Sequence, residues 1–251
     1  MLISIVTVTK NDCSALQRTF ESLKRQSARN YEWIVVDGAS TDGSIAFLQS
    51  ISENINLNWV SELDKGIYSA MNRGIGMATA PFVWFLNAGD TFANSETLSL
   101  VESALRSVHE QQGVFYGGYL RILGVSGSMH RRAQPPGYLY HSLPTSHQAM
   151  IFPTNATRAL GFDTTYKVCG DYDITARLHR SGIPLIRLDQ ELCRFAPGGF
   201  SFRHPALLVV EAARVQRTIL NMSLHRIFLS AARRCANILG VAILHALKSS
   251  E

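Results

Sequence analysis

Trp33-Ile-Val-Val-Asp37-Gly-Ala-Ser-Thr-Asp42-Gly43 is an apolar run that ends abruptly in a polar loop. The stretch Phe82-Val-Trp-Phe-Leu-Asn87-Ala-Gly-Asp90 repeats this pattern about fifty residues later. Such runs of apolar, β-branched and aromatic residues are typical of buried parallel strands. Because ligands of open α/β sheets bind outside the carboxyl ends of the strands, we expect both acidic loops to face one crevice.

Strands and helices are expected to alternate around these two runs. The strands are expected over 2–9, 31–37, 56–60, 81–87 and 113–119, and the helices over 13–26, 43–52, 66–78 and 94–110. Successive strand-helix-strand units of this length indicate an α/β fold with a mainly parallel sheet flanked by helices. Residues 1–118 would form its ligand-binding half.

The pattern changes after Gly118 to shorter pieces punctuated by glycine and proline. We expect a mixed or antiparallel half over 119–202, followed by a helical tail over 203–251. The second half should contain a hairpin about Gly127, a strand near 147–152, a helix over 171–181, one or two strands within 183–195, and a mobile loop over 197–201.

Composition and charge indicate a globular protein with an unusual C-terminal tail. The 251 residues are 46% apolar and 17% charged, which suits one sizeable core. The formal charge of +5 lies wholly in 203–251, where seven basic residues face two acidic ones. The tail mixes arginine with apolar residues, which fits an amphipathic helix lying on an anionic membrane surface. The alternative is a helical hairpin packed on the rest of the chain or on a second subunit.

Several protein classes are disfavoured by what the sequence lacks. Its four cysteines have no C-x-x-C spacing, which argues against a zinc site or a disulfide framework. The first residues lack the pattern of a signal peptide, and no apolar stretch approaches the ~20 residues needed to span a bilayer. No interleaved basic and aromatic module indicates nucleic acid binding. We therefore expect a cytoplasmic protein with reduced thiols.

Common nucleotide and hydrolase motifs are also absent. The first strand runs into Thr9-Lys-Asn-Asp12 where a dinucleotide site would show G-x-G-x-x-G. A P-loop, H-E-x-x-H and G-x-S-x-G are missing too. The remaining candidates for chemistry are carboxylates at strand ends.

Four further segments follow one another along the chain: Ile3-Ser-Ile-Val-Thr-Val-Thr9, Val35-Val-Asp37-Gly-Ala-Ser-Thr-Asp42-Gly43, Gly66-Ile-Tyr-Ser-Ala-Met-Asn72-Arg-Gly74 and Phe85-Leu-Asn87-Ala-Gly-Asp90. Their order and spacing resemble those of family 2 glycosyltransferases over about residues 1–200. The resemblance implies a Rossmann-like GT-A fold. Three further segments resemble glycosyltransferases of colanic acid and related exopolysaccharide biosynthesis: Ser61 to Tyr68, Tyr140 to Gln148, and Gly198-Gly-Phe-Ser201.

The resemblance assigns a group of residues to the nucleotide-sugar donor. Asp37 would accept the imide N–H of uracil, and Asp64 would belong to the donor-binding loop. Thr7, Asn72 and Asn87 are further donor contacts. Asp37 before Gly38 is also typical of a carboxylate that caps a turn.

A second group corresponds to the metal site and the general base. Asp90 stands in the family's acidic D-x-D motif and would hold Mg²⁺ or Mn²⁺, although Asn87 and Gly89 occupy positions where acids are frequent. Asp171 corresponds to the base of the family's Glu-Asp motif, with glycine at the preceding position. Asp90 and Asp171 could also cap helices.

Three other features are less specific. Asp173 would point elsewhere than Asp171, because i and i+2 do not share a helix face. His147 with Gln148 would contact the acceptor, the donor sugar or a phosphate, or else be structural. Gly198 to Ser201 would close over the bound donor or simply form a turn.

Together these features predict an inverting, metal-assisted glycosyltransferase. It would move a sugar from a UDP- or GDP-linked donor to a polyprenyl-diphosphate-linked oligosaccharide, as a peripheral protein on the cytoplasmic face of the inner membrane. A non-catalytic nucleotide-sugar-binding homologue and a nucleotidyltransferase remain as alternatives. The sugar, the base, the acceptor hydroxyl and the oligomeric state do not follow from the sequence.

Overall fold

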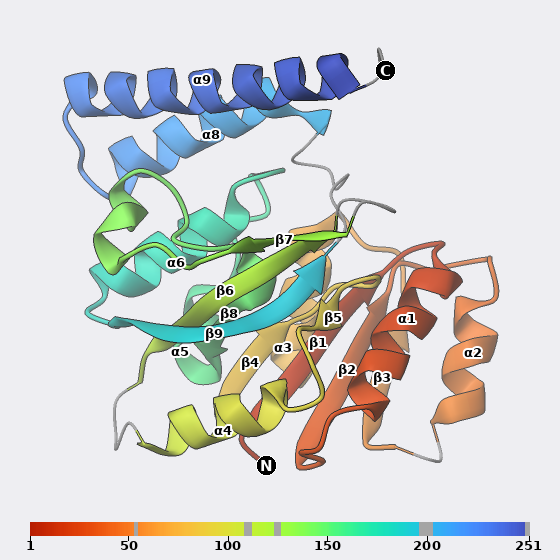
Figure 1. The fold of residues 1–251 in the computed structure, drawn as a ribbon. Coiled ribbons are helices and arrows are strands. Elements are labelled where there is room, and N and C mark those ends of the chain that lie inside the picture. Colours follow the sequence, from red (N-terminus) through yellow and green to blue (C-terminus); the bar gives the residue numbers. More distant parts are fainter. Residues whose placement is uncertain (53–54, 108–111, 123–126, 196–202, 249–251) are drawn as a thin grey trace.

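One mixed sheet organises the chain (Figure 1). The computed structural model describes residues 1–52, 55–107, 112–122, 127–195 and 203–248. Within this part the sheet has nine strands: β1 (Ile3–Thr9), β2 (Tyr31–Asp37), β3 (Leu57–Ser61), β4 (Phe82–Phe85), β5 (Thr91–Phe92), β6 (Val114–Ile122), β7 (Ser128–Arg131), β8 (Met150–Pro153) and β9 (Leu185–Phe195). Their order is β3-β2-β1-β4-β8-β6-β9-β5, and β7 pairs with β6.

The first half of the sheet is parallel and the second is mixed, as the sequence predicts. Strands β3, β2, β1 and β4 run parallel, whereas β8 pairs antiparallel with both β4 and β6. Thr9 at the end of β1 lies beside Asp37 at the end of β2. Strands β2 and β3 lie on one side of β1, and β4 lies on the other side. Such a switch point in strand order opens a crevice at the carboxyl ends of the strands.

Helices cover both faces of the sheet. They are α1 (Cys13–Lys24), α2 (Ser44–Ile51), α3 (Ile67–Met77), α4 (Thr97–Ser107), α5 (Thr154–Leu160), α6 (Gly170–Arg180), α8 (Pro205–Thr218) and α9 (Leu224–Lys248). Two short 3-10 turns occupy Pro136–Tyr140 and His147–Ala149. The sequence did not predict β5 or α5, and α4 begins later than expected because Asn94 caps the preceding turn through the Glu96 N–H (2.9 Å).

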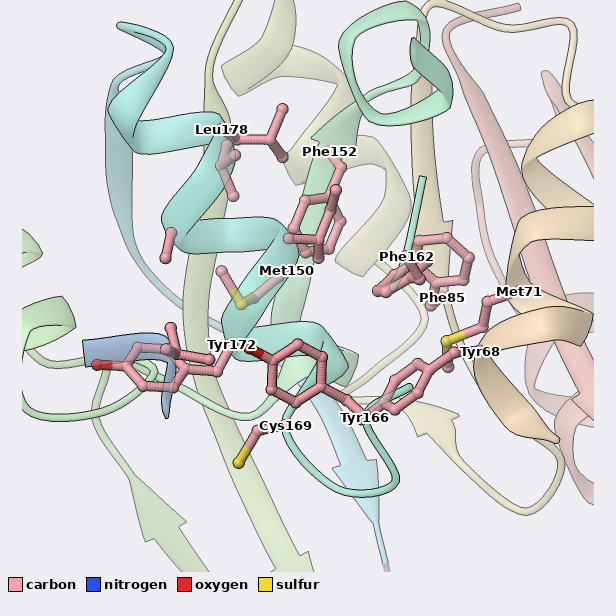
Figure 2. Packing of buried hydrophobic residues seen from close by; sticks show 14 of the residues in the cluster. Tyr68, Met71, Phe85, Met150, Phe152, Phe162, Tyr166, Cys169, Tyr172 and Leu178 are labelled. Carbon is pink, nitrogen blue, oxygen red and sulfur yellow. The ribbon is translucent and has the colours of Figure 1, made fainter. Parts of the chain in front are cut away.

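Strand alternation divides the core into two clusters. On β1, Ile3 and Ile5 pack with α1, α2 and α4, whereas Val6 and Val8 face α3 and α6. Figure 2 shows aromatic side chains of the second cluster, where Tyr68 stacks on Phe162 with ring centroids 5.5 Å apart. Burial of each such ring stabilises the fold by roughly 1.5–3 kcal/mol. This cluster fixes α3 and α6 relative to each other.

The tail folds back as a helical hairpin on the rest of the molecule. Helix α9 is the outermost element and lies along α8 (Figure 1). Ala212, Val215 and Ile227 belong to the core, and the Gln216 Nε2 donates to Ser230 Oγ (2.8 Å), which joins the two helices. Among the described residues, no helix combines the length and the apolar character needed to cross a bilayer. The expected mobile loop over 197–201 lies outside the described residues.

Candidate active site

A cavity of about 770 Å³ opens beyond the end of β4. The loop after β4 forms one side, the segment before β8 and the start of α6 form another, and the β6-β7 hairpin forms a third. Its polar lining includes Asp12, Asn87, Asp90, Tyr119, Arg121, Arg131, Arg132, Ser146, His147, Gln148 and Asp171. The structure therefore brings together three of the predicted site residues, Asn87, Asp90 and Asp171, and the predicted pair His147 and Gln148 in one cavity.

Backbone bonds hold the loop after β4 in place. The Ala88 N–H donates to Val8 O (3.2 Å) and the Gly89 N–H to Ala15 O (3.0 Å). The Thr19 hydroxyl of α1 accepts the Gly89 N–H (2.9 Å) and donates to Asp90 O (2.9 Å). Gly89 has a φ of +94°, a conformation that suits glycine and strains an aspartate. This explains why an acid is missing at that position of the D-x-D motif.

Asp90 is the buried carboxyl group of the cavity, with 8% of its surface exposed. Burial raises the pKa of Asp90 to about 7, while His147 and a hydrogen bond from the Gln148 side chain oppose the rise. The neighbouring Asn87 Oδ1 is buried and has no hydrogen-bond partner among the described residues. A buried carboxyl group and an unpaired amide oxygen are hard donors that suit Mg²⁺ or Mn²⁺.

The protein alone would supply only part of a metal's coordination shell. Among the described residues, no three His, Cys, Asp or Glu side chains gather closely enough to hold a metal ion. Mg²⁺ in nucleotide sites is commonly held by one or two carboxylates, with phosphate oxygens and water completing its shell. The residues present fit that type of site.

His147 links the base candidate to the loop after β4. Its Nδ1 lies 3.3 Å from Asp171 Oδ2, and its Nε2 lies 3.2 Å from Asn87 Nδ2. Because an amide nitrogen only donates, Nε2 is placed to accept from Asn87 and Nδ1 faces the Asp171 carboxylate. The other Asp171 oxygen, Oδ1, accepts the Tyr172 N–H (2.8 Å). Asp171 is thus oriented into the cavity from the first turn of α6.

Glycine precedes Asp171 for a steric reason. A Cβ at Gly170 would lie 2.7 Å from the ring of Tyr68. Tyr68 is buried and donates a hydrogen bond to Val168 O (2.8 Å), so the ring has no room to yield. The packing of α3 against α6 therefore excludes the glutamate that the family often has there.

Glu211 of α8 holds the backbone just ahead of α6, and the sequence did not point to it. Its carboxylate accepts the N–H groups of Lys167 (2.9 Å), Val168 (2.8 Å) and Cys169 (2.8 Å), just ahead of α6. The side chain is buried. The available signal was that Glu211 is the single acid in the apolar run Ala206 to Ala213. An acid in such a run is expected to be buried, and a buried carboxylate requires hydrogen-bond donors.

Asp37 and Asp64 form a separate polar site at the ends of β2 and β3. Asp37 is fully buried, and its Oδ2 accepts the Ser40 N–H (2.8 Å) and the Ser61 hydroxyl (2.6 Å). Its Oδ1 has no partner among the described residues. Asp64 accepts the Gly66 N–H (2.8 Å), and its Oδ2 would be 2.7 Å from a Cβ at position 38. Both carboxylates therefore flank Gly38.

Thr7 and Asn72, two further predicted donor contacts, form hydrogen bonds within the protein. Thr7 is fully buried, donates to Leu86 O (2.7 Å) and accepts the Trp33 Nε1–H (2.9 Å). Asn72 bonds the backbone N–H and C=O of Phe162 at 2.7 and 2.8 Å. Both side chains therefore join elements of the fold, and their contact with a donor stays a prediction.

Asp173 has a structural role, in keeping with its place on another face of α6. It is 2% exposed and pairs with Arg177 at 2.7 Å. Burial raises the pKa of Asp173, and Arg177 opposes the rise.

A family model described as glycosyl transferase family 2 matches residues 4–170, which is more than half of the chain. The chain belongs to glycosyltransferase family 2. Among its relatives, an uncharacterized glycosyltransferase of Mycobacterium tuberculosis is 28% identical over 244 residues, which cover 94% of this chain and 88% of the relative. The amylovoran biosynthesis glycosyltransferase AmsB of Erwinia amylovora is 26% identical over 209 residues, with 76% and 68% covered.

Solved structures show the same fold as this glycosyltransferase. Staphylococcus aureus TarS residues 1–349, in complex with UDP, superposes with a TM-score of 0.68 at 18% identity, covering 94% of this chain and 71% of that one. The mannosyltransferase PcManGT of Pyrobaculum calidifontis, in complex with GDP-Man and Mn²⁺, gives a TM-score of 0.67 at 17% identity, with 99% and 79% covered. The predicted GT-A fold is confirmed.

Proposed function

We propose that this glycosyltransferase is an inverting enzyme that uses a UDP- or GDP-linked sugar and Asp171 as its general base. The observation that carries the proposal is the orientation of Asp171. One carboxylate oxygen is held by the Tyr172 N–H and the other faces His147, inside the cavity that also contains Asp90. A base fixed in this way can reach a hydroxyl group in the cavity.

The donor would lie across the carboxyl ends of the first strands. The unpaired Asp37 Oδ1 is suited to accept a donor N–H from the base, beside Asp64 and Gly38. Asp90 and the Asn87 amide oxygen would hold Mg²⁺ or Mn²⁺. A bound divalent cation would neutralise the charge that develops on the leaving diphosphate.

Asp171 would act on the acceptor. As the acceptor oxygen attacks the anomeric carbon from the face opposite the diphosphate, its proton passes to Asp171 Oδ2. The bond from the anomeric carbon to the diphosphate breaks, and the configuration at that carbon inverts. His147 keeps the carboxylate aimed through its Nδ1–H. General-base catalysis of this kind contributes about 10²–10⁴-fold to a rate.

We further propose a lipid-linked oligosaccharide acceptor in exopolysaccharide biosynthesis, as in the colanic acid-like pathways that the sequence resembles. The name of the AmsB relative supports the polysaccharide class. The outer side of α9 supports a peripheral position on the cytoplasmic face of the membrane, because Leu224 and Phe228 are each 71% exposed. Arginines beside these apolar side chains favour an anionic surface.

Calorimetric titration with UDP and with GDP tests the donor site. The purified protein is titrated with each nucleotide in Mn²⁺ and again in EDTA. We expect one nucleotide to bind tightly with Mn²⁺ and much more weakly in EDTA. Binding of neither nucleotide would contradict the donor site, and equal binding with and without the metal would contradict the role of Asp90.

A further inference from the structure

One wall of the active-site cavity is basic, although the acids Asp90 and Asp171 line the same cavity. The wall consists of Arg121 on β6, Arg131 on β7 and Arg132 directly after it. Arg131 lies opposite Tyr119 in the antiparallel register, and Arg121 is two residues beyond Tyr119 on the same strand. Directly opposed residues and i, i+2 neighbours share one face of a sheet, so the hairpin presents Arg121 and Arg131 together.

Arg121 and Arg131 lie on the same face as Tyr119, which also lines the cavity. Burial raises the pKa of Tyr119, and Arg131 and Arg121 both oppose the rise, so both act on the same phenol. Within the part of the chain that is described, neither Arg131 nor Arg132 forms an ion pair with a carboxylate. Glu191 instead pairs at 2.5 Å with His130, which points to the opposite face of the hairpin.

We propose that this arginine wall binds an oxyanion carried by the acceptor, so that the substrate class is an anionic glycan acceptor bearing a phosphate, diphosphate or carboxylate. The inference rests on the proposed function, because it takes the cavity to be the place of transfer. Arginine forms paired hydrogen bonds to such groups, with a geometry that lysine does not offer.

The position of the wall favours the acceptor over the donor. Asp37 and Asp64, which would hold the nucleotide, do not line this cavity. The wall instead adjoins the segment Gln134 to Ser146 of the second half, where Gln134 N–H donates to Pro144 O (2.7 Å). The charge of the donor diphosphate would be met by the cation at Asp90, which lines the same cavity.

Inorganic pyrophosphate serves as the probe for the wall. It is titrated calorimetrically into wild-type protein that has been freed of divalent cations on a chelating resin, so that no cation at Asp90 draws it to the donor side and no soluble chelator competes for the wall. The same titration is made with Arg131→Gln/Arg132→Gln and with the control Arg106→Gln. Arg106 is an exposed arginine on α4, far from β7 in Figure 1. UDP and GDP affinities in Mn²⁺ are measured on all three proteins, and circular dichroism verifies their folding.

We expect the double variant to bind pyrophosphate at least about tenfold more weakly than wild type. The pyrophosphate affinity of Arg106→Gln and the nucleotide affinities of both variants should stay at the wild-type level. Equal pyrophosphate binding by wild type and double variant, or none by either, would overturn the inference. A parallel loss of nucleotide affinity would assign the wall to the donor and overturn it as well. Failure of the proposed function would show differently, as wild-type protein that binds neither nucleotide.

Discussion

At the scale of single residues, Asp90 makes stability depend on pH. Its folded pKa of about 7 lies above the ordinary value of 3.8. Between these values the folded protein binds one proton more than the unfolded chain, so stability falls as pH rises through this window. Asp90→Asn does not titrate at this position, so its free energy of unfolding should not fall in this way. In EDTA we expect the free energy of unfolding of Asp90→Asn, relative to that of wild type, to rise by about 2–4 kcal/mol as the pH is raised from 4 to 8.

Urea unfolding of both proteins across that pH range measures the effect. A difference between wild type and Asp90→Asn that does not change with pH would show that burial does not perturb this carboxyl group.

Glu211 should support catalysis without touching substrate. Glu211→Gln keeps the volume but removes the charge that three N–H groups share ahead of α6. We expect a loss of about 1–3 kcal/mol in free energy of unfolding and a lower kcat from a less ordered Asp171. The control is Glu62→Gln, because Glu62 forms a half-exposed ion pair with Arg73. Equal effects of the two substitutions, measured by urea unfolding and turnover, would refute the role.

The residues that the sequence located best are those at strand and helix ends. Asp90, Asn87 and Asp171 lie in one cavity because strand ends and a helix start are readable from the pattern of apolar runs. The hydrogen bonds of Thr7 inside the core could not be predicted, because the sequence pattern does not tell which polar residue on a buried strand finds partners there. Glu211 could not be assigned, since its partners lie about forty residues earlier.

At the scale of elements, α3 packs closely on β1 through a glycine. A Cβ at Gly74 would lie 2.4 Å from Val6 Cγ1, whereas nothing lies within 4 Å of one at Gly76. We therefore expect Gly74→Ala to destabilise the protein by about 1–3 kcal/mol. Gly76→Ala, on the same helix, should instead stabilise it by about 0.5–1 kcal/mol.

Thermal and urea unfolding of the two variants provide the comparison. The same sign of change for both would contradict the close contact between α3 and β1.

Elements of ordinary length were predicted correctly, and short ones were not. The parallel strands and the hairpin about Gly127 follow from apolar runs and turn residues. Strand β5 has two residues, Thr91–Phe92, and exists because β9 pairs with it. Helix α5 has seven residues and little apolar periodicity, so tertiary contacts decide its presence.

At the scale of the whole molecule, the α8-α9 hairpin presents an apolar outer side. Leu224 and Phe228 are one helical turn apart and both largely exposed. We expect the protein to bind vesicles that contain phosphatidylglycerol, and Leu224→Ser/Phe228→Ser to bind them several-fold more weakly, because each side chain loses apolar area to bury.

Flotation with these vesicles checks this prediction, with Leu100→Ser as the control. Leu100 is a 44% exposed leucine on α4, at the other end of the molecule (Figure 1). Vesicle binding that does not distinguish the double variant from the control, or wild-type protein that does not float, would contradict a membrane role for this surface.

The docking of the hairpin could not be read from the sequence. The sequence favoured a membrane-surface helix and kept a packed hairpin as the alternative. The structure shows the packed hairpin, because Ile227 and Ser230 are buried on the inner side of α9, while Phe228 is exposed. The inner contacts depend on Gln216 and His141, which lie far apart in the chain.

The most direct test of the central claim is turnover by Asp171→Asn. Release of nucleoside diphosphate and of pyrophosphate is measured with UDP- and GDP-linked sugars and extracted polyprenyl-diphosphate-linked glycans. Wild type and Asp189→Asn, an exposed carboxylate on β9, serve as references. Wild type should release nucleoside diphosphate, and Asp171→Asn should do so about 10²-fold more slowly or worse with unchanged nucleotide affinity. Near-normal turnover by Asp171→Asn, or pyrophosphate as the product, would contradict the account.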